Sequence, residues 1–531
     1  MMRRALLSGL LLTLSLVIPL GNVNAADVRS SWDYNKLSDV TDPNKMRAIF
    51  GFFPNRSVND DYSFTVTIQD AKPYQYFSVL LSPCTSFNKI DMNFDACIEN
   101  VAYRKKGDSS WSNSALSKIS LGEPTTTLKK GGDLVVGKPV TSDPNTLRPP
   151  GDRATIWEMP GAKHAKGSSY LVRATIRHPG ADNTSYIDGG LQRLFTMEIL
   201  PISFTASGTT ITQDKFKVEE FPEGYEYKLK LRMGVFIKSL SGWFLGRIQD
   251  PLIDRNGPAG YLEVAGTPAK VPVGITNVIN KSEIPQKYLG KCPEVGGCYW
   301  TANTFGKAAF FPAIDRPDPQ LLADFEEVSG GVKTAATLTH WELDSSRLSD
   351  VTTLNSSAKQ CTDKLYGPSA RVFMGAVSSN ATLYQGTPPE WDEVSKSFSF
   401  KVASPHLDEK GSPNKGFYTL YIPIEQASCR WGQDASLPQA QVQIVNKDGT
   451  SSVTTAVATQ ENGLLRFNIT GFGYSSPTIR LKMGEQSFAP AQTVQKTTSG
   501  PAKKVISCVK GKSVKQVVSL NPKCPAGYKK K

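Results

Sequence analysis

Two short serine motifs are the closest match in this chain to a nucleophilic catalytic site. Ser356-Ser-Ala-Lys359 has the Ser-x-x-Lys spacing of penicillin-binding chemistry, in which a lysine lowers the barrier to attack by the serine. Ser378-Ser-Asn380 has the accompanying Ser-x-Asn spacing, but no Lys-Thr-Gly follows and the two motifs lie too close together. Their surroundings are predicted to be strands, whereas this chemistry places the serine at the start of a helix. We therefore interpret both motifs as chance matches.

Histidines and carboxylates form no recognisable acid–base or metal-binding pattern. No histidine belongs to a closely spaced ligand pair, so we expect ordinary surface or core residues at His164, His178, His340 and His406. Asp324, Glu326 and Glu327 lie on the solvent side of a predicted helix. A glycosidase pair drawn from separate strands would leave no local pattern. No catalytic, metal-binding or cofactor-binding residue is predicted, and no cofactor.

The eight cysteines indicate disulfides. Their number alone leaves the pairing open, but the spacing favours neighbours within each predicted domain, namely Cys84–Cys97, Cys292–Cys298, Cys361–Cys429 and Cys508–Cys524. The rival interpretation is a thiolate metal site. Zinc sites combine a close cysteine pair with a second pair or with histidines, and this chain shows no such spacing.

Residues 1–25 have the pattern of a secretory signal peptide. Arg3 and Arg4 precede an apolar run over 5–20, and Val23-Asn24-Ala25 supplies the small residues that a signal peptidase prefers. The residue after this site is Ala26, which cannot accept a lipid as a cysteine would. No later apolar stretch reaches the ~18 residues of a spanning helix. We expect a secreted protein with no transmembrane segment after cleavage, which agrees with disulfides.

The positive charge is concentrated at the carboxyl end. Nine lysines and no acid lie in the last stretch, at Lys503, Lys504, Lys510, Lys512, Lys515, Lys523, Lys529, Lys530 and Lys531. The formal charge of +13 falls to +2 for residues 26–500 once these nine and the two leader arginines are removed. Such a tail attracts polyanions, which outside a cell are envelope polymers or lipid headgroups, not nucleic acid. A solubilising tail without a partner is the other interpretation.

Alternation of apolar and polar residues predicts a mainly β chain. The clearest strand runs over 225–235, where tyrosine, leucine, methionine and valine alternate with charged residues. Shorter alternating strands are predicted over 62–68 and 398–402. One helix is predicted, where Asp318-Pro319 precedes an apolar stripe that ends at Gly330.

Turn residues divide the carboxyl-terminal half into a compact set of about six strands. The expected strands cover 398–402, 417–424, 441–446, 450–458, 464–469 and 477–482. Asp448-Gly449 and Asn462-Gly463 are dipeptides that tolerate the positive φ of hairpin turns. The spacing is typical of an immunoglobulin-like β-sandwich. A Cys361–Cys429 bridge would tie it to the preceding segment.

The predicted organisation is multidomain, because about five hundred residues exceed one core. An N-terminal β-rich domain over 26–205 is followed by a central β-rich domain over 220–400 and the sandwich over 401–486. A linker over 487–502 leads to the basic tail, 503–531. In the tail, 504–509 and 514–520 are predicted to pair around Gly511 in a small disulfide-closed unit.

Several sequence blocks stand in a fixed order between about 225 and 485. They are Lys238-Ser-Leu-Ser-Gly-Trp-Phe-Leu-Gly-Arg-Ile-Gln-Asp-Pro251, Val377-Ser-Ser-Asn-Ala-Thr-Leu-Tyr384, Lys415-Gly-Phe-Tyr-Thr-Leu-Tyr-Ile422, Ser428-Cys-Arg-Trp-Gly432 and Ser475-Ser-Pro-Thr-Ile-Arg-Leu-Lys482. In these blocks the chain resembles a family of large secreted proteins from actinobacteria. The segment from Cys508 to Lys523-Cys-Pro-Ala-Gly-Tyr-Lys-Lys-Lys531 resembles a short module that ends other exported proteins of these bacteria. The resemblance implies export and this architecture, and it adds no catalytic residue.

Five tryptophans fall in the same region, Trp243, Trp300, Trp341, Trp391 and Trp431. Exposed tryptophans on sandwiches can stack on sugars, but a large β core also needs several. We expect core positions, with Trp243 the most exposed.

These observations favour an exported, non-enzymatic protein of the cell envelope that acts in adhesion, ligand binding or surface structure. Its expected partner is an anionic envelope polymer or a glycan. The alternative is a secreted enzyme acting on polysaccharide or another envelope polymer.

Overall fold

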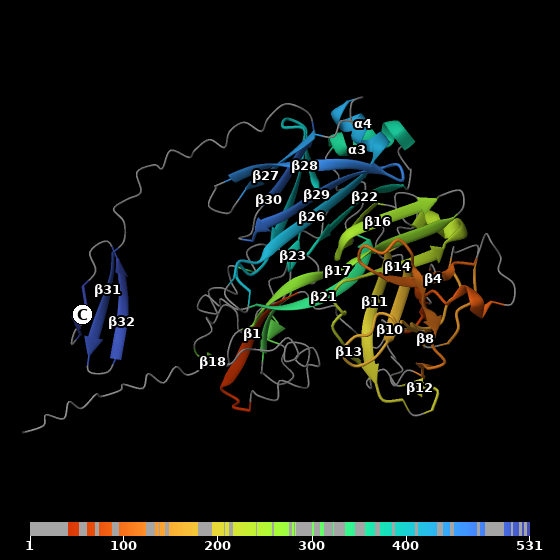
Figure 1. Cartoon of the computed structure of the whole chain (residues 1–531), viewed down its shortest axis with the longest axis horizontal. Helices are drawn as coiled ribbons and strands as arrows, with labels where there is room; N and C mark the ends of the chain where they lie inside the picture. The colour runs from red at the N-terminus through yellow and green to blue at the C-terminus, as the bar shows by residue number, and fades with distance from the viewer. Residues whose placement is uncertain are drawn as a thin grey trace, which may run out of the picture.

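The computed structural model shows a chain built mainly of β-strands, which confirms the expected fold class (Figure 1). The structure describes residues 41–51, 61–68, 74–87, 95–123, 133–136, 138–143, 148–178, 194–206, 208–211, 216–239, 242–256, 260–275, 279–280, 282, 300–301, 308–312, 322, 335–345, 356–366, 372–384, 388–408, 412–432, 439–445, 451–474, 478–483, 504–510, 513–519, 523–524 and 528–530.

The strands between residues 45 and 345 supply two layers. Up to residue 218 the strands are β1 (Lys45–Gly51), β2 (Phe64–Ile68), β3 (Tyr74–Leu80), β4 (Cys97–Lys105), β5 (Ser112–Asn113), β6 (Ala115–Leu116), β7 (Ser120–Leu121), β8 (Asp133–Val136), β9 (Thr155–Glu158), β10 (Ser169–His178), β11 (Leu194–Phe204), β12 (Thr210–Ile211) and β13 (Phe216–Val218). Then follow β14 (Tyr225–Arg232), β15 (Gly242–Gly246), β16 (Ile248–Asn256), β17 (Tyr261–Ile275), β18 (Ile279–Asn280), β19 (Trp300–Thr301), β20 (Ala308–Pro312) and β21 (Ala335–Ser345).

One layer runs in the order β5-β4-β14-β17-β16 and the other includes β3, β10, β11 and β21. Figure 1 shows β4 and β14 lying across β10 and β11. Apolar side chains of both layers form one core, to which β14 gives Tyr227, Leu229 and Leu231. The long strand β17 belongs to both layers, since it pairs with β14 and then with β21.

The alternation predicted for 225–235 is confirmed along β14. Tyr227, Leu229 and Leu231 are fully buried, while the charged residues between them are only partly covered. The strand ends at Arg232, earlier than expected, because a 3-10 helix over Gly234–Ser239 follows it.

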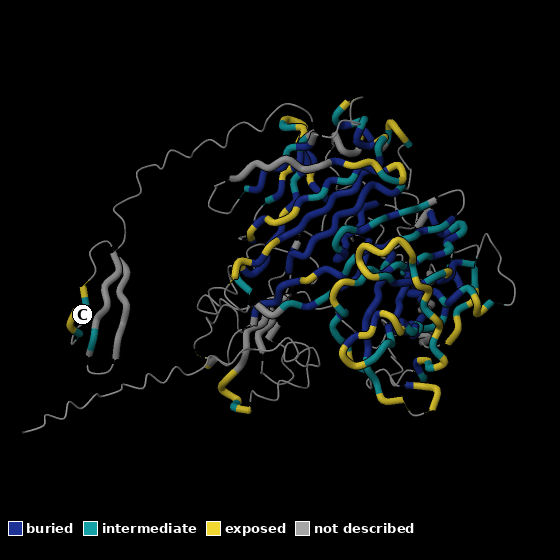
Figure 2. Tube along the Cα trace, viewed as in Figure 1, coloured by how far each residue is buried: buried dark blue, intermediate teal, exposed yellow. Residues whose placement is uncertain are grey.

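The carboxyl-terminal strands surround a second core. Here the structure has β22 (Phe373–Ser379), β23 (Leu383–Tyr384), β24 (Glu390–Asp392), β25 (Ser397–Ala403), β26 (Lys415–Pro423), β27 (Gln439–Val445), β28 (Ser451–Glu461), β29 (Leu464–Gly473) and β30 (Thr478–Met483). The six strands predicted from turn residues are confirmed, and they pair antiparallel in the order β25-β30-β27-β28-β29-β26. Their inward side chains form a separate apolar cluster. Figure 2 shows buried stretches along the middle of these strands.

Strand pairs join the segments that the sequence assigned to separate domains. β4 and β11 of the first segment pair with β14 and β21 of the second, and β26 continues through β22 and β15 to β21. The division into domains stays a prediction. The predicted domains are joined by sheets whose hydrogen-bonded strands come from more than one of them.

Two helices lie beside the second core, α3 (Ser356–Tyr366) and α4 (Ile424–Trp431). Helix α3 corrects the expectation of strands around Ser356, and α4 begins where the predicted strand 417–424 ends. A disulfide between Cys361 and Cys429 joins the two helices, with the pairing that the spacing predicts. The helix predicted after Asp318 lies outside the described residues apart from Leu322, which is helical and buried.

Candidate functional site

Five of the nine predicted polyanion-binding lysines lie in a small sheet at the carboxyl end. Strands β31 (Lys504–Lys510), β32 (Ser513–Ser519) and β33 (Lys529–Lys530) pair antiparallel in the order β32-β31-β33. Within the described part of the chain these strands pair only with one another. The predicted hairpin is thus confirmed, and Cys524 is disulfide-bonded.

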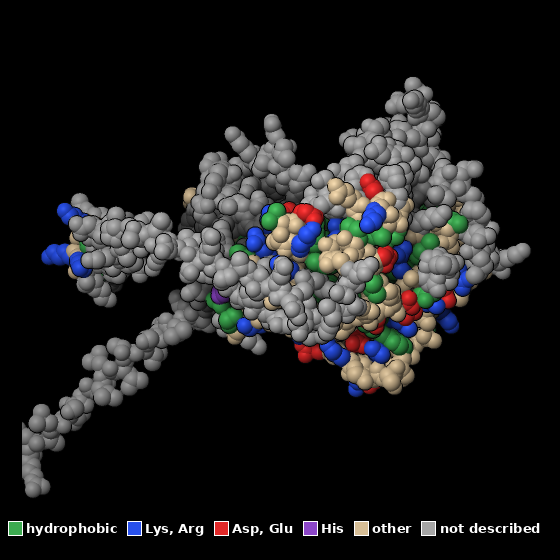
Figure 3. All heavy atoms as spheres, turned by 90° about the horizontal axis from the view of Figure 1, so that it is seen from above, with side chains coloured by type: hydrophobic (Ala, Val, Ile, Leu, Met, Phe, Trp, Pro, Cys, Tyr) green, Lys and Arg blue, Asp and Glu red, His purple; other side chains and the backbone are tan. Residues whose placement is uncertain are grey.

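The structure places the tail lysines to different extents. Lys523, Lys529 and Lys530 are exposed, and Lys504, Lys510 and Lys515 occupy strand positions in the backbone. Lys503, Lys512 and Lys531 lie outside the described residues. Figure 3 shows blue side chains at the described tip of the tail, whereas blue and red ones intermix over the body.

The outer side of β4, β14 and β17, away from the first core, carries a band of partly exposed charged residues. We call this surface the outer charged face. Its ion pairs are Arg104 Nε–Glu226 Oε2 at 2.6 Å, Lys228 Nζ–Glu263 Oε1 at 3.4 Å, Lys230 Nζ–Glu99 Oε1 at 3.4 Å and Arg232 Nη2–Glu99 Oε1 at 3.8 Å. Each of these cations therefore has a carboxylate of the same face as a close neighbour. The face forms because the alternation of β14 that buries its apolar residues turns the charged ones outward.

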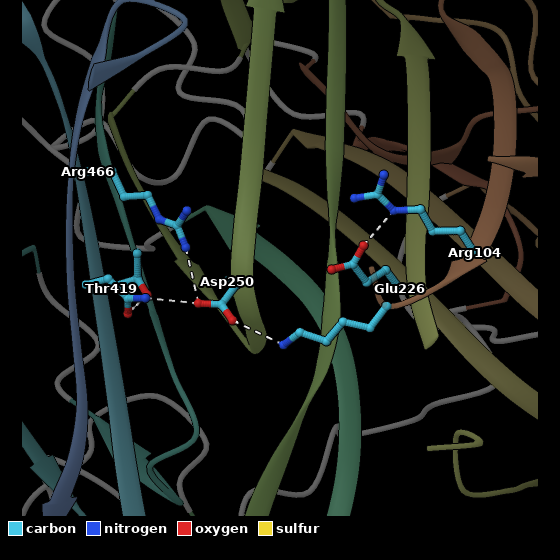
Figure 4. A network of polar contacts seen from close by, with 7 residues as sticks. Arg104, Glu226, Asp250, Thr419 and Arg466 are labelled. Carbon is cyan, nitrogen blue, oxygen red and sulfur yellow. Dashed lines mark hydrogen bonds and ion pairs between the residues drawn. The ribbon is translucent and has the colours of Figure 1, made fainter. Parts of the chain in front are cut away.

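Asp250 extends this network to the second core (Figure 4). Its carboxylate accepts hydrogen bonds from Arg466 Nη2 at 3.2 Å and Asn468 Nδ2 at 3.0 Å, both on β29. Lys106 Nζ lies 3.5 Å from its other oxygen. Thr419 Oγ1 on β26 donates to Asn468 Oδ1 at 3.2 Å. One carboxylate thus joins strands that belong to both cores.

The backbone at Asp250 explains how the side chain reaches so far. Its φ is 51°, and the register of β16 against β17 shifts between Gln249 and Leu252. A bulge of this kind redirects a side chain, and Asp tolerates positive φ better than most residues. This site was not predicted from the sequence, although Pro251 within a strand is a signal for a bulge.

Trp111 lies next to the outer charged face. The Arg104 guanidinium carbon is 4.4 Å and Lys228 Nζ 4.9 Å from the centre of a Trp111 ring. Both cations also contact carboxylates, Glu226 and Glu263. The Trp111 ring and these carboxylates therefore already have close partners. The outer charged face is suited to holding its strands together, and it presents a nearly neutral polar surface.

Further ionic groups are buried inside the body. The guanidinium of Arg247 lies 3.3 Å from a Glu342 oxygen and donates to the Ala381 and Thr382 carbonyls. Arg430 lies over the rings of Trp391 and Phe398, and burial lowers its pKa to about 10. These groups contact protein on their charged ends, which indicates a structural role.

The serine motifs occupy structural positions. Ser378 and Ser379 are buried and donate to the Ile248 and Phe417 carbonyls. Asn380 donates to the Lys270 and Lys415 carbonyls. Ser356 begins α3, contrary to the strand expectation, but the side chains over 356–359 are not described.

The remaining candidates do not converge on one site. His164 and His340 are buried, and His406 is exposed with its ring beside the Tyr474 carbonyl. The His178 side chain and residues 324, 326 and 327 lie outside the described part. The described residues contain no group of three or more metal-ligating side chains close enough to hold an ion.

The tryptophans serve mainly as core residues. Trp341 and Trp391 are buried as expected, and Trp431 is partly covered. The expectation that Trp243 is the most exposed of the five is wrong, because β15 lies between β21 and β22 and its five residues are buried. The Trp300 side chain is not described.

Of the other predicted disulfides, Cys84–Cys97 is formed, Cys292 and Cys298 lie outside the described residues, and the Cys508 side chain is not described. Among the described residues, no helix is long and apolar enough to cross a membrane. The chain matches no family model and no curated protein.

Proposed function

We propose that this chain is an exported, non-enzymatic protein of the cell envelope. The basic tail holds it to an anionic envelope polymer, and the β body acts there in adhesion, ligand binding or surface structure. We assign different roles to the tail and the body because they differ in how many carboxylates accompany their cations.

The observation that carries the proposal is this difference in charge pairing. On the outer charged face, cations such as Arg104 and Lys228 lie within 4 Å of a carboxylate of the body. Such pairs leave little net field for a polyanion. The tail has nine lysines and no Asp or Glu over 503–531. A polyanion therefore gains more by contacting the tail, where no side-chain carboxylate competes with it.

Export is supported by the pattern of residues 1–25 and by the cysteines. Two disulfides join Cys84 to Cys97 and Cys361 to Cys429 in the body. Stable disulfides are typical of oxidising compartments outside the cytoplasm. In such a compartment a lysine-rich sheet meets envelope polymers and lipid headgroups, and not chromosomes.

The test is the cellular location of the full chain and of a chain that lacks residues 503–531. We expect the full chain in the envelope fraction and its release by added salt, because salt weakens counterion-driven binding. The shortened chain should appear in the medium. Equal envelope retention of both chains, unaffected by salt, would overturn the role of the tail and favour a merely solubilising segment.

A further inference from the structure

The strand register of the tail collects most of its strand lysines on one face. Directly paired residues of antiparallel strands lie on the same face of a sheet, and successive residues alternate. Cys508 pairs with Lys515 on β32 and with Lys530 on β33. Lys504 and Lys510 lie on the same face, four and two residues from Cys508. We call this surface, defined by Lys504, Lys510, Lys515 and Lys530, the basic face.

The opposite face has a different composition. It holds Val505, Val509, Val514 and Val518, which pair across β31 and β32, together with Lys529 opposite Val509. The basic face itself holds one apolar pair, Ile506 with Val517. The register thus separates four lysines from four valines.

The basic face is compact. Neighbouring strands are about 4.8 Å apart, so the positions of Lys515 and Lys530, on either side of β31, are separated by about 10 Å. Lys510 is two residues along β31 from Cys508, or about 7 Å. Three positive positions therefore surround one cysteine at separations that a single polymer segment can span.

We propose that the basic face is the binding site of the tail and that its ligand is a linear polymer with closely spaced phosphate or carboxylate groups. This inference rests on the proposed function and adds to it that the position of the lysines matters, and not only their number. Several lysines that contact one chain at once release several counterions together. Charges placed elsewhere on the tail contact that chain less well.

A polymer fits better than a lipid bilayer. Proteins that lie on a bilayer insert apolar side chains on the same side as their basic residues. In the tail, the four valines lie on the face opposite the four lysines. The basic face and the larger apolar set cannot both meet one planar membrane.

The test compares two double variants of the full chain with the same change in charge. Lys515→Gln/Lys530→Gln alters the basic face, while the matched control Lys523→Gln/Lys529→Gln removes two exposed lysines that are not among its four, Lys529 on the opposite face and Lys523 outside the strands. Binding to inorganic polyphosphate and to polygalacturonate is measured over a range of salt. We expect the basic-face variant to bind about tenfold more weakly. The slope of its log binding constant against log salt concentration should fall by about two, because two lysine contacts are lost. The affinity of the control should change less than about threefold.

Lys515→Arg/Lys530→Arg should restore binding, and intact-mass analysis should show the tail disulfide in every variant. Equal losses in both Gln variants would overturn the basic face and leave the tail as a charge-driven anchor. Wild-type binding by both Gln variants, together with unchanged retention of the shortened chain, would overturn the proposed function as well. Tighter binding to phosphatidylglycerol vesicles than to either polymer would overturn the choice of ligand.

Discussion

At the scale of single residues, Asp250 shows how a small backbone irregularity can join distant parts of this chain. The bulge before Pro251 turns its carboxylate toward β29, where Arg466 and Asn468 donate to it. The side chain is only about one-third exposed, at 32%, so these bonds are partly shielded from water. The two hydrogen bonds that Asp250 accepts offset the energetic cost of its positive φ.

We expect Asp250→Ala to lower the free energy of unfolding by about 2 kcal/mol, since charged hydrogen bonds are lost and alanine disfavours positive φ. Asp250→Gly removes the same bonds without the backbone cost, so it should be less destabilising. The measurement is urea unfolding. The matched control is Asp108→Ala, in an exposed turn, with a loss below about 0.5 kcal/mol. Equal stability of Asp250→Ala and the control would contradict the account.

At the scale of elements, local signals predicted strands well. The alternation along β14 and the turns at Asp448-Gly449 and Asn462-Gly463 involve residues close in sequence, and the strands they imply are present. The short helix α3 was not predicted, because its residues 356–366 carry no strong apolar stripe and its place beside α4 is fixed by a distant cysteine.

Pairings between distant strands were beyond the sequence. Nothing local in β11 indicates that Ile199 lies opposite Trp341 of β21. Trp243 was placed wrongly for the same reason, since distant strands cover it, among them β22 and β25, which contributes Phe398. The lysine-rich tail could be recognised in the sequence because it depends on composition, whereas the network at Asp250 depends on contacts more than 200 residues apart.

The two disulfides of the body should differ in their effect on stability. In the chain-entropy model, the loss grows with the length of the loop that the bridge closes. Cys361 and Cys429 are separated by 68 residues, Cys84 and Cys97 by 13. We expect Cys361→Ser/Cys429→Ser to lower the free energy of unfolding by about 4 kcal/mol and Cys84→Ser/Cys97→Ser by about 3 kcal/mol. Guanidinium unfolding measures both, and a larger loss from the short loop would contradict this order.

At the scale of the whole molecule, several tyrosines of the body are buried, and the cations of the outer charged face lie beside carboxylates. Burial raises the pKa of Tyr62 to about 12 and raises the pKa of Tyr170, Tyr418 and Tyr474 still further. In the unfolded chain these phenols ionise near pH 10. Their stabilisation is therefore complete below about pH 10 and is lost as the pH rises toward the folded values.

We expect the free energy of unfolding to fall as the pH rises from about 10 to about 11, and tyrosinate absorbance to show that part of the tyrosines stay protonated until the chain unfolds. Tyr418→Phe should reduce the loss at about pH 11 by about 1.4 kcal/mol, because one ionisable phenol is removed. Ionisation of all tyrosines near pH 10, with the circular dichroism of the folded chain unchanged, would show that they are not buried as described.

The most direct test of the central claim is chromatography of the purified chain on immobilised polyphosphate, with and without residues 503–531. We predict that the tail binds the polyanion because no Asp or Glu of the tail competes for its lysines. The full chain should then be retained at low salt and eluted as salt rises, while the shortened chain passes through. Retention of the shortened chain to the same salt concentration as the full chain would show that the body binds the polyanion and would contradict the account.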